Sequence, residues 1–327
     1  MDLDINKLVT QILQGSRIGL SRSITLLEST RADHRKLSED LLSKLLPKTG
    51  RAIRVAISGP PGVGKSSFIE ALGMRLVGQG KKIAVLAIDP SSPITGGSIL
   101  GDKARMEELS KSELSFIRPT PSSGVLGGVA RHTRETLLLC EAAGFDVVLI
   151  ETVGIGQSEI MAASMTDIFV QLHQPFSGDE LQGIKKGAME LADLIIVTKA
   201  DGDALTAAEI AKNELEQAVM LTRTAEHGIP SVLLASAHKN TGIAAVWTSI
   251  LSFVEQQKAS GSHSQKRRAQ SRQWLNQEIS TELLALLNSQ ARFEELLKIT
   301  QQRVETSGEH CSRAARNLIL SLLAPCP

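Results

Sequence analysis

The sequence predicts an α/β protein in which a mostly parallel β-sheet is flanked by helices, with helical extensions at both ends. Between residues 53 and 254, short apolar runs alternate with segments of helical periodicity, which is typical of strands buried between layers of helices. A glycine-rich segment separates the first apolar run from a helical one. Outside this region, apolar residues recur at intervals of three and four. These observations predict a central α/β domain between two helical segments.

Residues 1–50 are expected to form an N-terminal helical extension. Two sets of apolar residues occur there at helical spacing, close to a proline. The sets are Ile5, Leu8, Val9, Ile12 and Leu13, followed by Leu37, Leu41, Leu42, Leu45 and Leu46. We therefore expect amphipathic helices that end near Pro47.

Residues 51–257 are expected to form the central α/β domain. Its apolar runs are short enough to be strands, and a helical segment follows most of them. The predicted strands are residues 54–57, 83–88, 147–150, 168–172, 194–197 and 232–234. Side chains at the ends of such strands meet at one edge of the sheet, so this edge is where a ligand is expected.

Residues 258–327 are expected to form a C-terminal helical tail. The tail opens with a polar stretch, residues 258–272, which carries five basic residues and no acidic one. We interpret this stretch as a linker or an exposed helix start rather than a binding patch. Apolar residues then recur at helical spacing from Trp274 to Val304 and again over 318–323. The pattern leaves open whether these faces pack on the same chain or on a second copy.

Composition argues against several classes of protein. The 36 basic and 35 acidic residues give a net charge of +1, and seven Phe, two Trp and no Tyr leave few surfaces for base stacking, so nucleic acid is not expected as a partner. The three cysteines, Cys140, Cys311 and Cys326, lack the spacing of a disulfide framework or zinc site. They are interpreted as reduced thiols in a reducing compartment.

No membrane association is expected, because no apolar run approaches the roughly 18 residues of a spanning helix. The first residues, Met1 to Asp4, are acidic, whereas secretory and mitochondrial leaders are basic. The cytoplasm is therefore the expected location, or the mitochondrial matrix if a transit peptide has been removed.

The sharpest motif is a phosphate-binding loop of the form G-x-x-x-x-G-K-[ST], located between a predicted strand and a helix. Its glycines let backbone N–H groups and a helix N-terminus face phosphate oxygens. Lys65 is expected to neutralise phosphates, and Ser66 to ligate Mg²⁺. The nucleotide-binding candidates in this loop are Gly59, Pro60, Pro61, Gly62, Val63, Gly64, Lys65, Ser66 and Ser67.

Two later elements indicate guanine as the base. Thr198, Lys199 and Asp201 form a T-K-x-D sequence related to the N-K-x-D signature of GTPases. A carboxylate at Asp201 accepts hydrogen bonds from guanine N1 and N2, whereas adenine offers it no donor at these positions. Ser236, Ala237 and His238 resemble the S-A-x element that meets guanine O6. Because some Rho-like GTPases also carry Thr at the first position, we expect weaker loop bracing rather than changed specificity.

Acidic residues between these motifs are candidates for holding Mg²⁺ with Ser66. Asp89 and Glu151 follow predicted strands, and Asp102 lies between them. The sequence 151–154 stands where many GTPases have D-x-x-G, so Gly154 is expected to contact the γ-phosphate. Ile155 occupies the position of a water-orienting Gln, which predicts slow hydrolysis unless a partner or Gln157 assists.

The motifs together resemble the methylmalonyl-CoA mutase-associated GTPases, the group of bacterial MeaB and human MMAA, some members of which were once labelled ArgK. The resemblance rests on residues 59–67, 88–92, 100–106, 127–135, 151–159 and 178–187. It implies a P-loop GTPase core, commonly a homodimer, that binds Mg²⁺ and GTP or GDP. It also implies a partner, the adenosylcobalamin-dependent methylmalonyl-CoA mutase, whose cofactor loading the GTPase gates and which it protects or reactivates.

The resemblance also implies roles for individual residues. Lys65, Ser66, Asp89, Asp102 and Glu151 would serve phosphate and Mg²⁺. The segment 178–187 would be a further switch with Asp179 and Lys185 as its polar contacts, and Lys185 would reach the γ-phosphate when the partner binds. Residues 221–230 lack the Trp-rich sequence associated with many members, so a related acyl-CoA mutase, such as an isobutyryl- or 2-hydroxyisobutyryl-CoA enzyme, stays open as the partner.

Three other functions fit these residues less well. A P-loop kinase would use the same phosphate loop, but Asp201 and the lack of an evident acceptor-site base favour GTP hydrolysis. A metallochaperone GTPase should show His or Cys clusters, whereas the seven His are scattered and the three Cys isolated. A scaffold with a degraded nucleotide site is disfavoured because every phosphate-binding residue is present.

Overall fold

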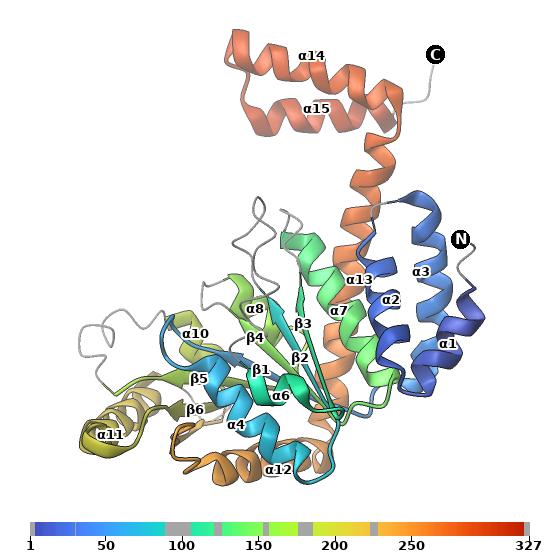
Figure 1. The fold of residues 1–327 in the computed structure, drawn as a ribbon. Coiled ribbons are helices and arrows are strands. Elements are labelled where there is room, and N and C mark those ends of the chain that lie inside the picture. Colours follow the sequence, from blue (N-terminus) through green and yellow to red (C-terminus); the bar gives the residue numbers. More distant parts are fainter. Residues whose placement is uncertain are drawn as a thin grey trace. The chain divides into compact units, whose positions relative to one another are not determined.

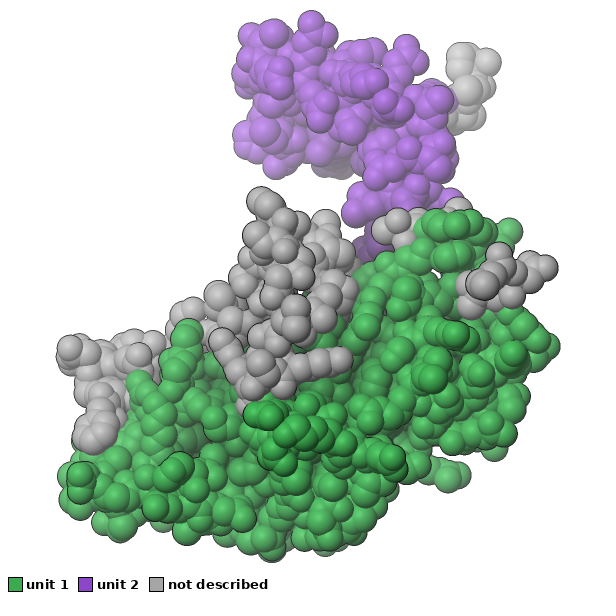
Figure 2. All heavy atoms as spheres, viewed as in Figure 1, with its two compact units in different colours: residues 1–267 green, residues 268–327 purple. Residues whose placement is uncertain are grey.

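The computed structural model describes residues 4–29, 31–88, 106–120, 126–152, 157–175, 186–222 and 228–323. The chain divides into two compact units, residues 1–267 and 268–327, coloured separately in Figure 2. The first unit contains the sheet and the helices around it, and the second contains helices alone. Sheet and helical extensions agree with the predicted fold class.

The N-terminal extension consists of α1 (Ile5–Leu13), α2 (Arg17–Leu27), α3 (Ala32–Leu45) and the short 3₁₀ helix η1 (Leu46–Lys48). These helices pack on one another and on α7 (Leu126–Ala142). Asp4 caps α1 by accepting hydrogen bonds from the N–H groups of Asn6 and Lys7. The helices end close to Pro47, as predicted, although Leu13 and Leu46 are exposed rather than buried.

The described strands form one seven-stranded sheet in which every pairing is parallel (Figure 1). Their order is β3-β2-β4-β1-β5-β6-β7. The strands are β1 (Ile53–Ser58), β2 (Ile83–Ile88), β3 (Ser115–Thr120), β4 (Val147–Thr152), β5 (Ile168–His173), β6 (Leu194–Val197) and β7 (Ser231–Leu234). Strand β3 was not predicted from the sequence, because this edge strand contains Arg118 and Pro119 in place of an apolar run.

Helices cover both faces of the sheet. On one face lie α4 (Lys65–Val77), α6 (Glu107–Lys111) and α12 (Ile243–Ala259), which share a hydrophobic core with alternate strand residues such as Val55, Ile57 and Leu172. The other face contacts α7, α8 (Gln157–Ala163) and α10 (Lys186–Leu191). In the sequence, η2 (Gly202–Ala204) and α11 (Leu205–Thr222) connect β6 to β7.

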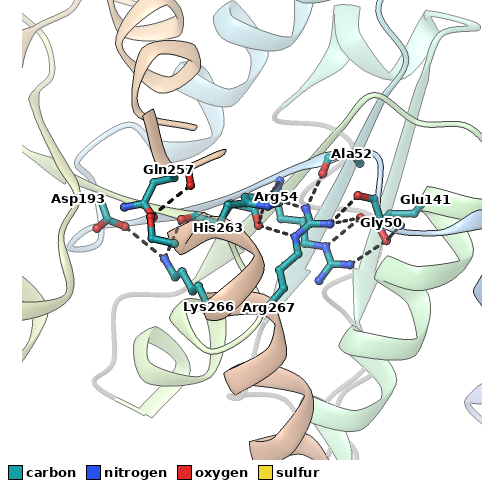
Figure 3. A network of polar contacts seen from close by, with 11 residues as sticks. Gly50, Ala52, Arg54, Glu141, Asp193, Gln257, His263, Lys266 and Arg267 are labelled. Atoms are coloured by element: carbon teal, nitrogen blue, oxygen red, sulfur yellow. Dashed lines mark hydrogen bonds and ion pairs between the residues drawn. The ribbon is translucent and has the colours of Figure 1, made fainter. Parts of the chain in front are cut away.

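At the amino edge, where the strands begin, buried ion pairs tie β1 to its neighbours (Figure 3). Arg54 of β1 donates to both carboxylate oxygens of Glu141 on α7, at 2.9 and 2.8 Å. Asp167, directly before β5, accepts from the backbone N–H of Arg54 at 2.8 Å. Removing one partner of a buried pair leaves the other charge without compensation, so these pairs hold the start of the sheet together.

The first turns of α13 (Ser262–Asn288) join the same network. Arg267 donates to both carboxylate oxygens of Asp167, each at 2.8 Å, and to the carbonyls of Gly50 and Ala52 at 2.7 Å. Lys266 donates to the carbonyl of Asp167 at 2.7 Å. Burial opposes ionisation of Asp167, but the hydrogen bonds and charge of Arg267 keep the pKa of Asp167 below its usual value. Part of the basic stretch 258–272 therefore forms hydrogen bonds and ion pairs within the first unit.

The second unit consists of the remainder of α13, α14 (Ala291–Ser307) and α15 (Cys311–Leu323). Helices α14 and α15 pack together, with Phe293, Ala314 and Leu318 buried. The helical character predicted for the tail is confirmed. Among the helices of the described ranges, none combines the length and apolar character needed to span a bilayer.

Candidate functional site

The loop between β1 and α4, residues 59–64, lies at the carboxyl edge, where the strands end. At Gly59 a Cβ atom would lie 2.8 Å from the carbonyl oxygen of Leu172 on β5, so only glycine fits beside that strand. Gly64 has φ +94° and precedes the first residue of α4, which has no side-chain cap. The first N–H groups of α4 therefore face the loop as an anion site would require.

Lys65 and Ser66 begin α4 and contact different partners. Lys65 Nζ donates to the carbonyl oxygens of Gly59 and Pro60, at 2.7 and 3.0 Å. Ser66 Oγ donates to Glu151 Oε1 on β4, at 3.1 Å. The structure thus brings the buried carboxylate of Glu151 on β4 to the lysine and the hydroxyl that begin α4.

The T-K-x-D segment after β6 contacts the phosphate loop directly. The hydroxyl of Thr198, which is buried, lies 2.7 Å from the carbonyl oxygen of Val63 and 3.0 Å from that of His173. Lys199 Nζ donates to the carbonyl oxygen of Gly62 at 2.7 Å. Two consecutive residues of this segment therefore hydrogen-bond to the loop that would carry the phosphates.

Asp201 and the S-A-x element lie together. The hydroxyl of Ser236 donates to Asp201 Oδ2 and accepts the backbone N–H of Lys239 at 3.0 Å. Ser236 is buried, Asp201 and Ala237 are half-buried, and His238 is exposed. Ser236 thereby orients the carboxylate of Asp201, while part of this residue stays accessible to a ligand.

A second set of polar side chains, which the sequence analysis did not single out, lies beneath the loop. Thr152 Oγ1 donates to Ser58 Oγ at 2.9 Å, and Ser58 Oγ donates to Glu159 Oε1 at 2.8 Å. All three residues are buried. A polar residue at the end of each of two apolar strands was the only local signal for Ser58 and Thr152.

Two further polar side chains are buried on β5. Gln171 pairs in register with Ser58, and His173 follows two residues later on the same face of the sheet. Burial lowers the pKa of His173 to about 4, so its imidazole is neutral at physiological pH. Within the described ranges, neither Gln171 Oε1 nor His173 Nε2 has a hydrogen-bond partner.

Several predicted site residues lie outside the described residues: Asp89, Asp102, Gly154, Asp179 and Lys185. Gln157 is the first residue of α8, but its side chain is also outside the described part. Of the others, Pro60 is half-buried, and Pro61 and Ser67 are exposed.

The oxygen atoms present suit a hard divalent cation. Ser66 Oγ and Glu151 Oε1 lie 3.1 Å apart beside the phosphate loop, and hydroxyl and carboxylate oxygens are the ligands that Mg²⁺ prefers. In the part of the chain that the structure describes, no group of three or more His, Cys, Asp or Glu residues could hold a metal by itself.

Comparison with known proteins agrees with this geometry. A family model described as methylmalonyl-CoA mutase-associated GTPase MeaB matches residues 20–292. A putative GTPase of Caulobacter vibrioides is 52% identical over 273 residues, which cover 84% of each chain. A mouse (Mus musculus) protein named methylmalonic aciduria type A homolog, mitochondrial, is 42% identical over 326 residues, covering 96% of this chain and 79% of that protein.

A solved structure has the same fold over nearly its whole length. It is described as a LAO/AO transport system kinase and is 38% identical to this chain. The two structures superpose with a TM-score of 0.76, and the match covers 98% of each chain. The similarity therefore includes both helical extensions as well as the sheet and its phosphate loop.

Proposed function

Because this chain belongs to the family of methylmalonyl-CoA mutase-associated GTPases, we propose that it binds GTP with Mg²⁺ at the carboxyl edge and hydrolyses it slowly until a partner assists. One observation carries the proposal. The T-K-x-D segment hydrogen-bonds to the phosphate loop through Thr198 and Lys199, so a phosphate site and a base-reading carboxylate are joined. A nucleotide lying across that junction would contact both.

The phosphates would bind at the start of α4. Lys65 contacts neutral carbonyl groups of the loop, and a phosphate would attract its ammonium group more strongly than these do. Gly59, Pro60, Pro61, Gly62, Val63, Gly64, Ser66 and Ser67 complete the proposed phosphate site. Their contribution is to position the nucleotide and to stabilise charge that develops on the γ-phosphate, which is the main demand of this reaction.

The base would be read by Asp201. Its carboxylate, oriented by Ser236, would accept the N1 and N2 protons of guanine. Ala237 and His238 would meet guanine O6 through the backbone, and the aliphatic part of Lys199 would lie along the base. Adenine would leave Asp201 without a donor, so we expect GTP to be preferred over ATP.

Mg²⁺ would be held by Ser66 and Glu151, with Asp89 and Asp102 as further proposed ligands. When bound, the ion neutralises phosphate charge. Gly154 would contact the γ-phosphate, and Asp179 belongs to the proposed additional switch. Because the aliphatic Ile155 cannot orient water, we propose that Gln157 or Lys185 assists hydrolysis once the partner binds.

The proposed partner is an adenosylcobalamin-dependent acyl-CoA mutase, with methylmalonyl-CoA mutase as the first candidate. In this proposal the GTPase gates cofactor loading and protects or reactivates the mutase. The compartment would be the one that holds the mutase. The support is family membership and the named relatives, which connect this type of GTPase with that enzyme.

We also propose that the chain works as a homodimer formed through its helical tail. On α13, four exposed apolar side chains recur along one stripe: Leu275, Ile279, Leu283 and Leu286, with exposed fractions of 59%, 47%, 56% and 60%. An apolar stripe of this kind would pack against the same stripe on a second copy of the chain. Sedimentation analysis should give a dimer for the native chain and a monomer for Leu283→Glu.

The first experiment is to measure hydrolysis of GTP and of ATP, each with Mg²⁺, with and without methylmalonyl-CoA mutase from the same organism. We expect slow hydrolysis of GTP alone, severalfold stimulation by the mutase, and little ATP use. Stimulation should then be lost in Lys185→Ala. GTP selectivity without stimulation would contradict the partner, while phosphate transfer to an added acceptor faster than to water would favour a kinase instead.

A further inference from the structure

The S-A-x element belongs to a loop that closes on itself. Residues 236–241, the base loop, lie between the end of β7 and the start of α12. At its two ends, Ser236 donates its backbone N–H to the carbonyl oxygen of Thr241 at 2.9 Å, and Thr241 donates in return at 3.1 Å. Within it, the N–H group of Asn240 donates to the carbonyl oxygen of Ala237 at 3.3 Å. Backbone hydrogen bonds therefore define the shape of the base loop.

Two backbone N–H groups of the base loop are available to a ligand. Among the described residues, no protein atom accepts the N–H group of Ala237 or that of His238. Ala237 is half-buried and His238 is exposed, so both are accessible. The preceding residue, Ser236, donates its hydroxyl to the carboxylate of Asp201. Two adjacent donors, which suit a carbonyl oxygen, thus follow directly on the residue that orients this carboxylate.

Gly242, directly after the base loop, packs against the backbone that enters it. Its φ is +76°, and a Cβ atom there would overlap the carbonyl oxygen of Leu234 and lie 2.9 Å from the Cα of Ala235. Both of these atoms belong to the main chain, so neither could rotate away as the end of a side chain could. Only glycine therefore lets the end of the base loop lie this close to its beginning.

The elements on either side of Gly242 are held firmly. Gly242 is the N-cap of α12, and Ile243, Val246 and Trp247 of this helix are buried in the hydrophobic core. On the other side, β7 is paired in register with β6. Moving the helix or the strand would disturb the core or the sheet, whereas the base loop is held by a few hydrogen bonds. An added Cβ atom at residue 242 would therefore displace the base loop.

From this packing we infer that Gly242 is a positioning residue for base recognition, which places the N–H groups of Ala237 and His238 against the 6-oxo group of guanine. The inference rests on the proposed function. Gly242 would not touch the nucleotide and acts through the base loop. Adenine has a 6-amino group at this position and cannot accept from these N–H groups, so displacing them costs guanine nucleotides affinity and adenine nucleotides none.

Other roles of Gly242 predict different patterns. If this glycine only stabilised the fold, an alanine there would lower the melting temperature and leave the affinities of the folded protein unchanged. If the clash instead spread to the phosphate loop, all nucleotides would be weakened equally, because all share the phosphate contacts. The ratio of GDP to ADP affinity separates these cases. IDP adds a further distinction, since hypoxanthine keeps the 6-oxo group of guanine but lacks the 2-amino group proposed to contact Asp201.

The test compares Gly242→Ala with the matched control Gly80→Ala, both in the full-length chain. Gly80 has the same φ of +76°, and a Cβ atom there would meet nothing within 4 Å. Both variants thus place alanine in a left-handed conformation, and only Gly242→Ala adds a clash. For each protein, the affinities for GDP, IDP and ADP are measured with Mg²⁺ by equilibrium competition, together with the melting temperature.

A second pair of variants acts on the base loop from its exposed side. Asn240 is exposed and has φ +53°, a conformation that asparagine tolerates and that β-branched residues avoid. Asn240→Val should therefore distort the loop without a clash in the core. Asn240→Gly adopts the same φ without steric cost and serves as the conservative variant.

We expect Gly242→Ala to weaken GDP and IDP by about tenfold each and to leave ADP within about twofold of wild type. Gly80→Ala should change none of the three affinities. Asn240→Val should show the same pattern at about threefold, and Asn240→Gly should bind as wild type does.

Equal weakening of GDP, IDP and ADP, or a lower melting temperature with unchanged affinities, would overturn the inference. A loss confined to GDP, with IDP unaffected, would place the effect at Asp201 and would overturn it as well. If the wild-type chain did not prefer GDP to ADP, the proposed function itself would fail. Should Gly242→Ala not fold, the comparison of Asn240→Val with Asn240→Gly decides the question.

Discussion

The amino edge and the carboxyl edge of the same sheet hold their charged side chains in different ways. At the amino edge, Arg54 and Arg267 each bind both oxygens of a buried carboxylate. At the carboxyl edge, Lys65 and Lys199 donate to carbonyl oxygens of the phosphate loop. A carbonyl group has no net charge, so a phosphate can draw a lysine away from it at little cost, whereas separating a buried ion pair exposes two uncompensated charges. Ion pairs thus stabilise the amino edge, and we propose that the lysines of the carboxyl edge exchange their carbonyl partners for a phosphate.

The largest loss of stability is expected when a charge is removed from the amino edge. Glu141→Gln keeps the shape of the side chain but leaves Arg54 without its buried counter-ion. We expect a loss of about 3–5 kcal/mol in the free energy of unfolding, measured by urea denaturation. The control is Glu107→Gln, which removes an exposed ion pair with Lys111 and should cost far less stability. Similar losses in the two variants would contradict the contrast.

The converse change removes a charge from the carboxyl edge. Lys65→Ala should lower GTP hydrolysis by about 10²–10³-fold, because a preorganised cation at the developing phosphate charge is lost. Its free energy of unfolding should stay within about 1 kcal/mol of wild type, since the hydrogen bonds described for Lys65 are to neutral carbonyl groups. Hydrolysis assays and urea denaturation on the same preparation test both halves of this prediction. A large loss of stability would show that Lys65 is a structural cation.

The comparison also extends to pH, because burial of His173 at the carboxyl edge makes the free energy of unfolding depend on pH. Its pKa is lowered by burial from 6.5 to about 4, so the unfolded chain binds a proton that the folded chain excludes. Between these pH values stability should rise with pH, and His173 should account for about 3 kcal/mol of that rise at most. His173→Gln should flatten the slope when unfolding is measured at about pH 4.5 and about pH 7.5, whereas replacing the exposed His238 by Gln should not. An unchanged slope in His173→Gln would contradict the assignment.

The smallest effect is expected at Thr198, whose bond to the phosphate loop joins two neutral groups. Thr198→Val removes the hydroxyl but keeps the volume and should weaken GTP and GDP alike by about fivefold. Preference over ATP should persist, because Asp201 is untouched. Nucleotide titrations measure both quantities. Loss of discrimination between GTP and ATP would mean that Thr198 shapes base choice and does more than brace the loop.

The sequence was most informative where structure depends on neighbours along the chain. The residues 59–66 could be recognised because phosphate binding needs glycines, a lysine and a hydroxyl at fixed spacing before a helix. Most strands could be predicted because a parallel sheet buries both of its faces. The edge strand β3 could not, since Arg118 and Pro119 interrupt its apolar run.

The contacts that could not be predicted join residues far apart in the sequence. Ser58 meets Glu159 across 101 positions, and Arg267 meets Asp167 across 100. A serine at a strand end and an arginine in a polar stretch have many ordinary explanations, and only the fold shows which carboxylate each one reaches. The basic stretch 258–272 illustrates this limit, because charge pattern alone favoured an exposed segment while the structure buries much of the Arg267 side chain.

The start of α13 has a consequence for how this protein could be divided and recombined. The helix begins at Ser262, inside the first compact unit, and that unit ends only at Arg267. A chain cut after residue 257, where the polar stretch begins, would lack Arg267 and would leave Asp167 without the guanidinium group that binds both of its carboxylate oxygens. A transplantable nucleotide-binding module should therefore carry the opening turns of α13 with it. In a fusion to another enzyme, the natural splice point lies inside a continuous helix, late in the polar stretch 258–272 rather than at its start.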